Sequence, residues 1–551
     1  MSLNNNNNLH GSPFWRTGLN KLRALIYRSP LYMVTLKKKK NLEITPLPGF
    51  LTNADHSRGK AILSGGFPFA GRTYKNAQVP WTTAQDDAAW QGYIHGFCWL
   101  DDLLACEDAQ GLVEARRLIK SWIDLHGVWT PLAWRADVMG ERLVSWMKNA
   151  AKITATADED FISAFNTSLS LQSSHLSRSY LQGLSGYHLL RALRGQLYVG
   201  LFVVGFIKSA DRALRRLGDE FNAQILADGG HISRNPQVLF ETLKLALELM
   251  DVFEKVEKDC PKAIRLSIDR MAPMVRTLRH GDGGLALFHG AQEGDGVEID
   301  AVLDKTENQG KPLSDARHSG FQRIEAGHMI LLMDVATPPS VDQNPAGHGA
   351  PLSFELSCGD ERLFVNCGSV LGGDQSWQSA LAATAAHNTV VVDDKNAVRL
   401  HKDGGVVSRD IHVESKRFEE NGEVLIDANH DAYKESFGLI HHRSVYLNKS
   451  GTDMRVEDKL IGTGGNQFAI SLHLHPDAHA SIVQDGQAAL IKTHSGAGWH
   501  LRAQGGKLEM RESIYMPNPG QVRHTDQILI QGPLRGDGAD VKWRLSRVGG
   551  V

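Results

Sequence analysis

Cysteine is scarce in this chain of 551 residues, and its pattern excludes two kinds of stabilising centre. The number of cysteines is odd, their spacing is wide, and no Cys-x-x-Cys pair occurs. These features argue against a disulfide framework and against a thiolate zinc site. We expect small buried hydrophobic side chains at all five positions, which are Cys98, Cys106, Cys260, Cys358 and Cys367.

An excess of charge of one sign is also missing. Lysine and arginine total 60 and aspartate and glutamate total 62, which gives a formal net charge of −2. The sequence therefore offers no global electrostatic basis for binding nucleic acid, and we expect no nucleic-acid partner. A local basic cleft for an acidic polymer needs no overall excess.

Long hydrophobic runs are absent, so we expect no transmembrane helix. Residues 1–30 contain no apolar core long enough for a signal peptide, which favours a cytoplasmic or inner-membrane-associated protein over a periplasmic one. Leu19, Leu22 and Ile26 form an apolar stripe among basic residues, and four lysines follow at 37–40. This segment is interpreted either as a weak membrane-surface contact or as a basic arm. The sequence leaves the oligomeric state open.

Two hydrophobic periods divide the chain. Residues 80–280 follow a helical period, as in 140–150, where apolar side chains recur three and four positions apart. After about residue 310 the period is two, as in the predicted hairpin of residues 353–368 around a Gly-Asp turn. A glycine-rich stretch, 279–298, links the halves. The length and these patterns predict an α+β multidomain protein with serial helices followed by an antiparallel β-sandwich.

Two helix starts carry candidate catalytic side chains. Tyr187-His188 opens an apolar helix, where the helix dipole favours a neutral imidazole suited to proton transfer. In "ADGGHISRNP", residues 227–236, His231, Arg234 and Asn235 lead into another helix N-terminus, a place that suits a carboxylate or phosphate. The alternatives are a surface histidine beside a core tyrosine and an ordinary helix–helix loop.

Histidines also stand at strand ends in the second half. His348 precedes a predicted strand, and His387 begins the strand of "TAAHNTVVVDD", residues 384–394. Together with Asn366 they predict a three-ligand metal site, although the spacing alone is a weak signal. The alternative for His387 is a side chain that caps backbone groups. His473 and His475 form a further pair on one strand face, with a solvent-facing strand as the alternative.

Four ordered motifs resemble the heparinase II/III-like polysaccharide lyase family over about residues 80–545. They are "YHLLRALRGQLYVGLFV", "QILADGGHISRNP", "GHGAPLSFELSCGDERLFVNCG" and "TAAHNTVVVDD". The resemblance implies an N-terminal incomplete α/α toroid followed by a C-terminal antiparallel β-sandwich. The predicted limits are 1–75 for the N-terminal arm, 76–310 for the toroid and 311–551 for the sandwich.

The resemblance also implies chemistry. Family members cleave acidic polysaccharides by β-elimination, and a metal in the sandwich often supports the cleft. From the helix-start motifs and the resemblance together, we predict catalytic roles for Tyr187, His188, His231 and Arg234. Substrate binding is assigned to Arg142, Arg191 and Asn235. A structural divalent metal, Zn²⁺ or Ca²⁺, is assigned to His348, His387 and Asn366.

The sequence departs from the family pattern at several of these positions. Tyr187 stands where the family has Asn, and Val238-Leu239 stand where it often has Tyr-His. Ala346 occupies the position of a catalytic-side His, and Asn366 occupies a position where a metal-binding Asp is frequent. Loss of a positioned acid or base typically costs about 10²–10⁴-fold in rate.

We therefore predict a bacterial protein that cleaves a uronate-containing glycan by β-elimination, with an acidic polysaccharide or oligosaccharide as its partner. Two alternatives stay open. One is a catalytically degenerate glycan-binding protein. The other is a glycan-processing enzyme of different chemistry near the inner membrane.

Overall fold

The computed structural model describes residues 22–36, 39–45, 47, 54–75, 79–106, 109–181, 183–307, 310–372, 375–402, 404–407 and 411–548. The chain forms two compact units, Met1–Glu220 and Phe221–Val551. The predicted domain limits follow the change in secondary structure, whereas packing divides the chain inside helix α10. Leu19 of the predicted N-terminal stripe and two of the four lysines at 37–40 lie outside the described residues.

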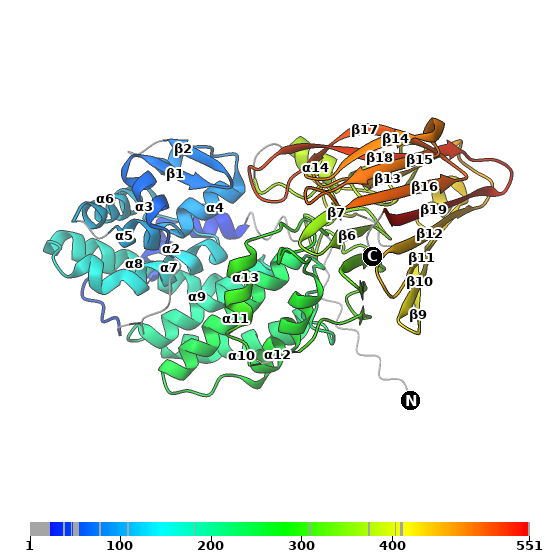
Figure 1. The fold of residues 1–551 in the computed structure, drawn as a ribbon. Coiled ribbons are helices and arrows are strands. Elements are labelled where there is room, and N and C mark those ends of the chain that lie inside the picture. Colours follow the sequence, from blue (N-terminus) through cyan, green and yellow to red (C-terminus); the bar gives the residue numbers. More distant parts are fainter. Residues whose placement is uncertain are drawn as a thin grey trace, which may run out of the picture. The chain divides into compact units, whose positions relative to one another are not determined.

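The first unit is mainly helical (Figure 1). A short hairpin of β1 (Gly66–Phe69) and β2 (Arg72–Lys75) precedes most of its helices. The helices are α2 (Pro30–Thr35), α3 (His56–Leu63), α4 (Ala88–Gly96), α5 (Leu100–Ala105), α6 (Ala109–His126), α7 (Ala136–Thr154), α8 (Glu159–Ser179), α9 (Gly186–Phe202) and α10 (Ile207–Gln224).

The predicted helical period corresponds to real buried faces. In α7 the apolar stripe of residues 140–150 is buried, with Leu143 and Trp146 fully inaccessible to solvent. Asn235 caps α11 (Pro236–Lys255) as predicted, because its side-chain oxygen accepts hydrogen bonds from the N–H groups of Gln237 and Val238 at 2.8 and 3.1 Å. Helices α12 (Lys262–Thr277) and α13 (Gly296–Leu303) follow.

Antiparallel sheets make up the remainder of the second unit. The five-stranded sheet has the order β3-β4-β5-β6-β7, the four-stranded sheet β17-β18-β13-β8, and the eight-stranded sheet β14-β15-β16-β19-β12-β11-β10-β9. The strands are β3 (Asp315–Ala316), β4 (Phe321–Ala326), β5 (Met329–Asp334), β6 (Phe354–Cys358), β7 (Glu361–Phe364), β8 (Val390–Val392), β9 (Val413–Glu420), β10 (Glu423–His430), β11 (Ile440–Leu447), β12 (Asp453–Ile461), β13 (Gln467–His473), β14 (His479–Val483), β15 (Ala488–Lys492), β16 (Gly498–Gln504), β17 (Lys507–Tyr515), β18 (Arg523–Pro533) and β19 (Gly538–Val548). Short helices α14 (Gln375–Ala382) and α15 (Lys434–Phe437) lie between them.

Side chains from all three larger sheets share one hydrophobic core. The predicted hairpin of residues 353–368 is present as β6 and β7, with Ser357 opposite Arg362. The predicted succession of helices and then antiparallel strands is therefore confirmed. The five cysteines are free thiols, but Cys98 is exposed and Cys358 half-buried, so the prediction of burial is wrong at these two positions.

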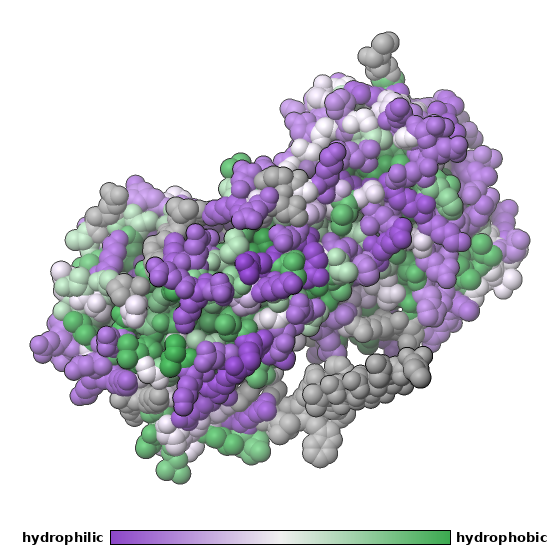
Figure 2. All heavy atoms as spheres, turned by 90° about the horizontal axis from the view of Figure 1, so that it is seen from below, coloured by the Kyte–Doolittle hydropathy of each residue, from purple (hydrophilic) through white to green (hydrophobic). Residues whose placement is uncertain are grey.

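The surface is mixed in character. On the face drawn in Figure 2, hydrophilic residues predominate among the coloured atoms, and hydrophobic residues lie in small groups between them. Scattered exposed hydrophobic side chains of this kind are ordinary for a folded protein. Within the described ranges, no helix is both long and apolar enough to cross a bilayer.

Candidate active site

A buried polar network in the second unit joins several of the residues predicted from sequence. Its centre is Asp334, the last residue of β5, whose side chain is 1% exposed. One carboxylate oxygen contacts the guanidinium of Arg234, and the other lies 2.8 Å from Nε2 of His289. The second contact lies off the direction of a good hydrogen bond, so it is mainly electrostatic. Burial alone would raise the pKa of Asp334, but these two neighbours lower it.

Arg234 is fully engaged by the protein. Its backbone is left-handed, with φ +55°, and its guanidinium donates to Asp334 and to four carbonyl oxygens. Those carbonyls belong to Ser319, Gly320, Ala336 and Thr337. A guanidinium has five N–H donors, and all five are occupied here. Arg234 therefore fastens the loop before α11 to the ends of β4 and β5.

The two predicted metal histidines meet side by side. Nδ1 of His387 lies 2.9 Å from the carbonyl of Ala383, so this nitrogen carries the proton and donates it. Nε2 of the same ring is then an acceptor, and it lies 2.8 Å from Nδ1 of His348. His348 must donate from Nδ1, which leaves its Nε2 unprotonated. The result is a directed relay that ends on a bare imidazole nitrogen.

That nitrogen has no partner in the part of the chain that the structure describes. His348 is 4% exposed as a whole. Its Nε2 forms no hydrogen bond with a described residue and is not completely enclosed, so this atom keeps some contact with solvent. Burial lowers the pKa of His348 well below its ordinary value, and it lowers the pKa of His387 to about 3. Both rings are therefore neutral near pH 7, so His348 presents a lone pair to solvent.

The other residues of the 227–236 motif are also buried. Nδ1 of His231 accepts from the backbone N–H of Ser233 at 3.0 Å, and Nε2 donates to Gln224 at 3.1 Å. Burial lowers the pKa of His231 to about 3. The amides of Asn235 and Asn344 both donate to the carbonyl of His289, at 3.0 and 2.8 Å. These residues hold the network together.

Asn366 lies beside the strand that His387 opens. Its side-chain oxygen accepts from the N–H of Asn388 at 3.2 Å, and its backbone N–H donates to Glu355 at 2.8 Å. The amide nitrogen of Asn366 is buried without a hydrogen-bond partner among the described residues. Orphaned buried donors are rare in folded proteins and mark a place for water or a ligand.

The remaining predicted catalytic pair lies in the first unit. Tyr187 and His188 begin α9, as predicted, and the His188 side chain is 54% exposed. Its Nδ1 is 2.8 Å from the carboxylate of Asp137, which is fully buried and also bound by Arg135. Burial opposes ionisation of Asp137, but the hydrogen bonds from His188 and Arg135 lower its pKa. This carboxylate fixes the orientation of the imidazole.

Of the two arginines predicted to bind substrate, both in the same unit, Arg142 is buried and Arg191 is half-buried. Arg142 is fully buried, donates to Gln172 and two backbone carbonyls, and lies over the ring of Trp122 at 4.1 Å. Arg191 pairs with Glu141 at 2.9 Å. These contacts give both arginines a place in the packing of the helices.

The histidine pair does not complete the predicted metal site. His348 and His387 supply two imidazoles, but within the described residues no group of three His, Cys, Asp or Glu side chains comes together. The facing nitrogens of the pair are joined by a hydrogen bond. The side-chain oxygen of Asn366 is engaged by a backbone N–H. The residues present therefore do not fit a metal that needs three such protein ligands.

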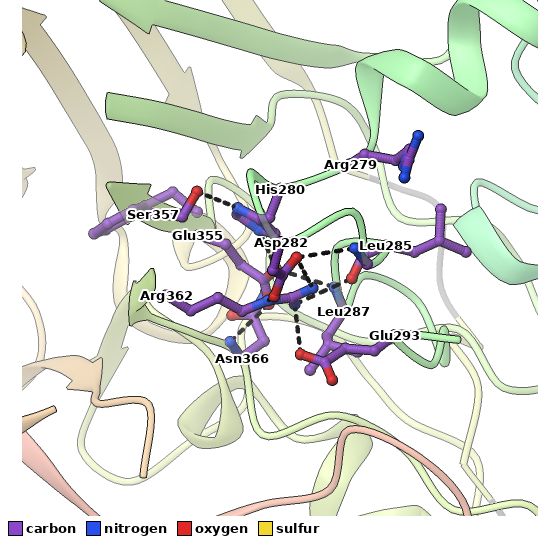
Figure 3. A network of polar contacts seen from close by, with 12 residues as sticks. Arg279, His280, Asp282, Leu285, Leu287, Glu293, Glu355, Ser357, Arg362 and Asn366 are labelled. Atoms are coloured by element: carbon purple, nitrogen blue, oxygen red, sulfur yellow. Dashed lines mark hydrogen bonds and ion pairs between the residues drawn. The ribbon is translucent and has the colours of Figure 1, made fainter. Parts of the chain in front are cut away.

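Sequence reasoning missed a second, partly buried network, which fastens the glycine-rich stretch of residues 279–298 (Figure 3). Arg362 from β7 binds Asp282 through two nitrogens, at 2.7 and 3.1 Å, and lies 3.1 Å from Glu293. His280 lies 3.0 Å from Glu355 of β6. The stretch that looked like a linker is thus anchored to the five-stranded sheet, because its charged residues pair with Glu355 on β6 and Arg362 on β7.

His289, Asp334 and Asn344 were missed as well. The only signals were a histidine inside the glycine-rich stretch and an aspartate at a strand end. His473 and His475, interpreted either as a further pair on one strand face or as part of a solvent-facing strand, differ in position. His473 is 2% exposed and bonds Ser513 at 2.7 Å, so the solvent-facing interpretation is wrong for it, whereas His475 lines a pocket of about 270 Å³.

Comparison with known proteins fits this architecture. The family model "Heparinase II/III-like, C-terminal" matches residues 308–544. The chain is 30% identical over 529 residues to FtsZ-localized protein C of Caulobacter vibrioides, covering 90% of this chain and 89% of that one. The chain therefore belongs to the heparinase II/III-like family.

Solved structures share the fold at low sequence identity. Heparinase III matches with a TM-score of 0.72 at 13% identity, covering 98% of this chain and 91% of that one. A mutant of the heparan sulfate lyase HepC from Pedobacter heparinus gives 0.64 at 14% identity, with 98% and 90% covered. A chondroitin AC lyase mutant from Streptomyces coelicolor gives 0.53 at 10% identity, with 91% and 81% covered.

Proposed function

We propose that this protein cleaves a uronate-containing acidic polysaccharide by β-elimination, with His348 as the proton acceptor. The observation that carries the proposal is the relay from Ala383 through His387 to His348, which ends on an unprotonated Nε2. We further infer that the helical part is an incomplete α/α toroid and that the sheets form a β-sandwich. The likeness to heparinase III supports this inference.

The chemistry needs a neutral base at this position. In β-elimination a proton leaves C5 of the uronate, and its electron pair forms the C4–C5 double bond. The bond from C4 to the leaving oxygen breaks, and that oxygen takes up a proton. Nε2 of His348 would receive the C5 proton, and the negative charge of a bound uronate would raise the pKa of the ring as it does so. A positioned base of this kind typically contributes about 10²–10⁴-fold in rate.

The neighbouring residues support the position of this base. Arg234 binds Asp334, and the amides of Asn235 and Asn344 hold the carbonyl of His289. Nδ1 of His289 in turn accepts from the backbone N–H of His348 at 3.4 Å. In the proposal these are positioning residues. Catalytic roles for Tyr187, His188 and His231 remain predictions from the sequence.

The predicted metal enters no step of the proposal. A Zn²⁺ or Ca²⁺ ion at His348 and His387 would replace the hydrogen bond that now joins their rings. It would also occupy a lone pair that the base needs if it bound Nε2 of His348. The metal expected from the sequence is tested separately below.

The first experiment is a substrate panel. The full chain is incubated with several uronate-containing polysaccharides, and the ultraviolet absorbance of the unsaturated uronate is followed. A rise on at least one polymer is expected. Measurable binding without a rise on any polymer would contradict turnover and would favour the catalytically degenerate glycan-binding protein.

The relative FtsZ-localized protein C favours a second candidate function, which is recruitment to the division site. This function is compatible with glycan binding and with a weak membrane contact through the basic N-terminal arm. It predicts that a fluorescent fusion of the full chain colocalises with FtsZ in dividing cells. A uniform distribution that does not change with FtsZ assembly would contradict it.

A further inference from the structure

The outer face of the eight-stranded sheet carries a groove of about 490 Å³. It lies over strands β10, β11, β12, β19 and β16, which are hydrogen-bonded neighbours in this order (Figure 1). All of its walls belong to the second unit. The predicted and proposed catalytic residues are absent from its lining, so the groove is distinct from the histidine relay.

Strand register places three arginines in one line across the groove. Arg455 on β12 is directly opposite Arg544 on β19, and Arg544 is directly opposite Arg502 on β16. Neighbouring strands are about 4.8 Å apart, so the three positions span about 10 Å. Their side chains alternate with buried neighbours and therefore all point to the solvent side.

Such a line of like charges has a cost in the free protein, since like charges directly opposite each other in a sheet destabilise it. Arg455 and Arg544 are partly compensated because both bind Asp453, at 2.7 and 2.5 Å. Arg502 forms no ion pair with any described residue. The side chains of Arg455 and Arg544 are also 59% and 55% exposed. Open guanidinium donors therefore remain in the groove.

An apolar strip continues the same line. Tyr446 is opposite Arg455, and Leu425 is opposite Tyr446. The guanidinium of Arg455 lies 5.4 Å from the centre of the Tyr446 ring. The groove thus offers cationic forks at one end and an apolar platform at the other. This combination suits a ligand that carries carboxylate or sulfate groups on a ring with apolar C–H faces.

The backbone of the groove argues for a sugar polymer over a peptide. An extended peptide usually gains its affinity by pairing with the free edge of a sheet. Here the strands under the arginines, β12, β19 and β16, each have a hydrogen-bonded neighbour on both sides, so no free edge lies there. A ligand must bind through side chains alone, which favours a polymer with anionic groups at regular spacing.

We propose that this groove is a second, non-catalytic binding site for an anionic polysaccharide chain. The class of polymer rests on the proposed function, whereas the position of the site rests on the sheet itself. The site would hold long chains on the protein, so short oligosaccharides would gain little from it.

The test measures binding of polygalacturonate and heparin to the full chain and to two variants, Arg502→Gln and Arg502→Gln/Arg544→Gln. The matched control is Arg511→Gln, an exposed arginine on β17 that pairs with Glu509 and does not line the groove. We expect the double variant to bind at least about tenfold more weakly at low salt, with the control unchanged. Added salt should narrow the difference.

Two results would overturn the proposal. One is equal binding of polygalacturonate and heparin by the wild type and the double variant, with thermal unfolding showing that both are folded. The other is a loss in the double variant that is as large for poly-glutamate as for polygalacturonate, which would assign the groove to acidic peptides. Unsaturated product with unimpaired binding by the variants would leave the proposed function intact and reject the groove. Binding that depends on the groove, without any unsaturated product, would support the groove and reject the proposed function.

Discussion

The buried network around Arg234 and the outer groove around Arg502 both contain arginine, but the guanidinium groups differ in whether their N–H donors are occupied by the protein. Every guanidinium N–H of Arg234 is donated to the protein. No ion pair engages Arg502 in the described part of the chain, and its side chain faces solvent. An arginine in a recognisable motif can therefore be structural, while one without a motif offers open donors.

The histidines show the same contrast. Both nitrogens of His231 are bonded inside the protein, whereas the relay through His387 leaves one nitrogen of His348 open. The comparison suggests that an unoccupied hydrogen-bond donor or acceptor indicates a binding or catalytic role better than the residue type does. The following predictions test this distinction, starting with the largest effect.

Replacement of Arg234 by alanine should destabilise the second unit strongly. Asp334 would keep a buried carboxylate without its main cation, and four carbonyl groups would lose their donor. Breaking a buried ion pair on one side typically costs about 3–5 kcal/mol in the free energy of unfolding. Urea unfolding measures the loss, with Arg502→Ala as the control. A loss below about 1 kcal/mol would show that Arg234 is not structural.

Acidification should destabilise the same unit. The folded-state pKa values of His231 and His387 are lowered to about 3, against an ordinary value of 6.5. The unfolded chain therefore binds more protons below pH 6.5, and stability falls as the pH falls from 6.5 towards 3. Each histidine contributes a loss of about 2 kcal/mol by pH 5.

Urea unfolding at pH 7.5, 6 and 5 measures this loss. A His231→Asn variant should show a shallower dependence on pH, because one titrating group has been removed. The matched control is His479→Asn, an exposed histidine on β14. Parallel pH dependences of the His231 variant and the wild type would contradict the buried, neutral assignment.

Metal removal should have little effect on catalysis. The His348–His387 pair is joined by a hydrogen bond, and no third His, Cys, Asp or Glu meets it among the described residues. We expect chelation to leave the rate of product formation within about twofold, which is small against the roughly 10²–10⁴-fold contribution of a positioned base. Loss of activity on chelation, with recovery on adding Zn²⁺ or Ca²⁺, would establish the metal site predicted from the sequence.

Replacement of Arg502 by glutamine should leave stability almost unchanged. This arginine lies opposite Arg544, so its removal relieves repulsion without breaking an ion pair. The free energy of unfolding should change by less than about 0.5 kcal/mol. A clear destabilisation would mean that the groove arginines serve the fold, which would remove the reason for assigning them to a ligand.

Much of the architecture was predictable from local pattern. The change from a helical to an alternating period gave the order of helices and strands, and the Gly-Asp turn gave the hairpin of β6 and β7. The cap at Asn235 was visible because Pro236 follows it. These features depend on neighbours in sequence, and local physical chemistry determines them.

The site was only partly predictable. The motifs located His348, His387 and Arg234, but pairing with Asp334 and His289 depends on residues 55–100 positions from Arg234. Contacts between residues far apart in sequence determine which hydrogen-bond donors are occupied. The hydrophobic periodicity of the sequence contains no information about these contacts. The line of arginines in the groove was invisible for the same reason, since strand register joins residues of β12, β16 and β19.

The most direct test of the account compares product formation by the wild type, His348→Ala and the matched control His479→Ala on the polymer that gives an unsaturated product. The relay predicts a rate about 10²–10⁴-fold lower for His348→Ala, with thermal unfolding showing that the variant is still folded and with an unaffected control. Equal rates for folded His348→Ala and the wild type would contradict the assignment of His348 as the base.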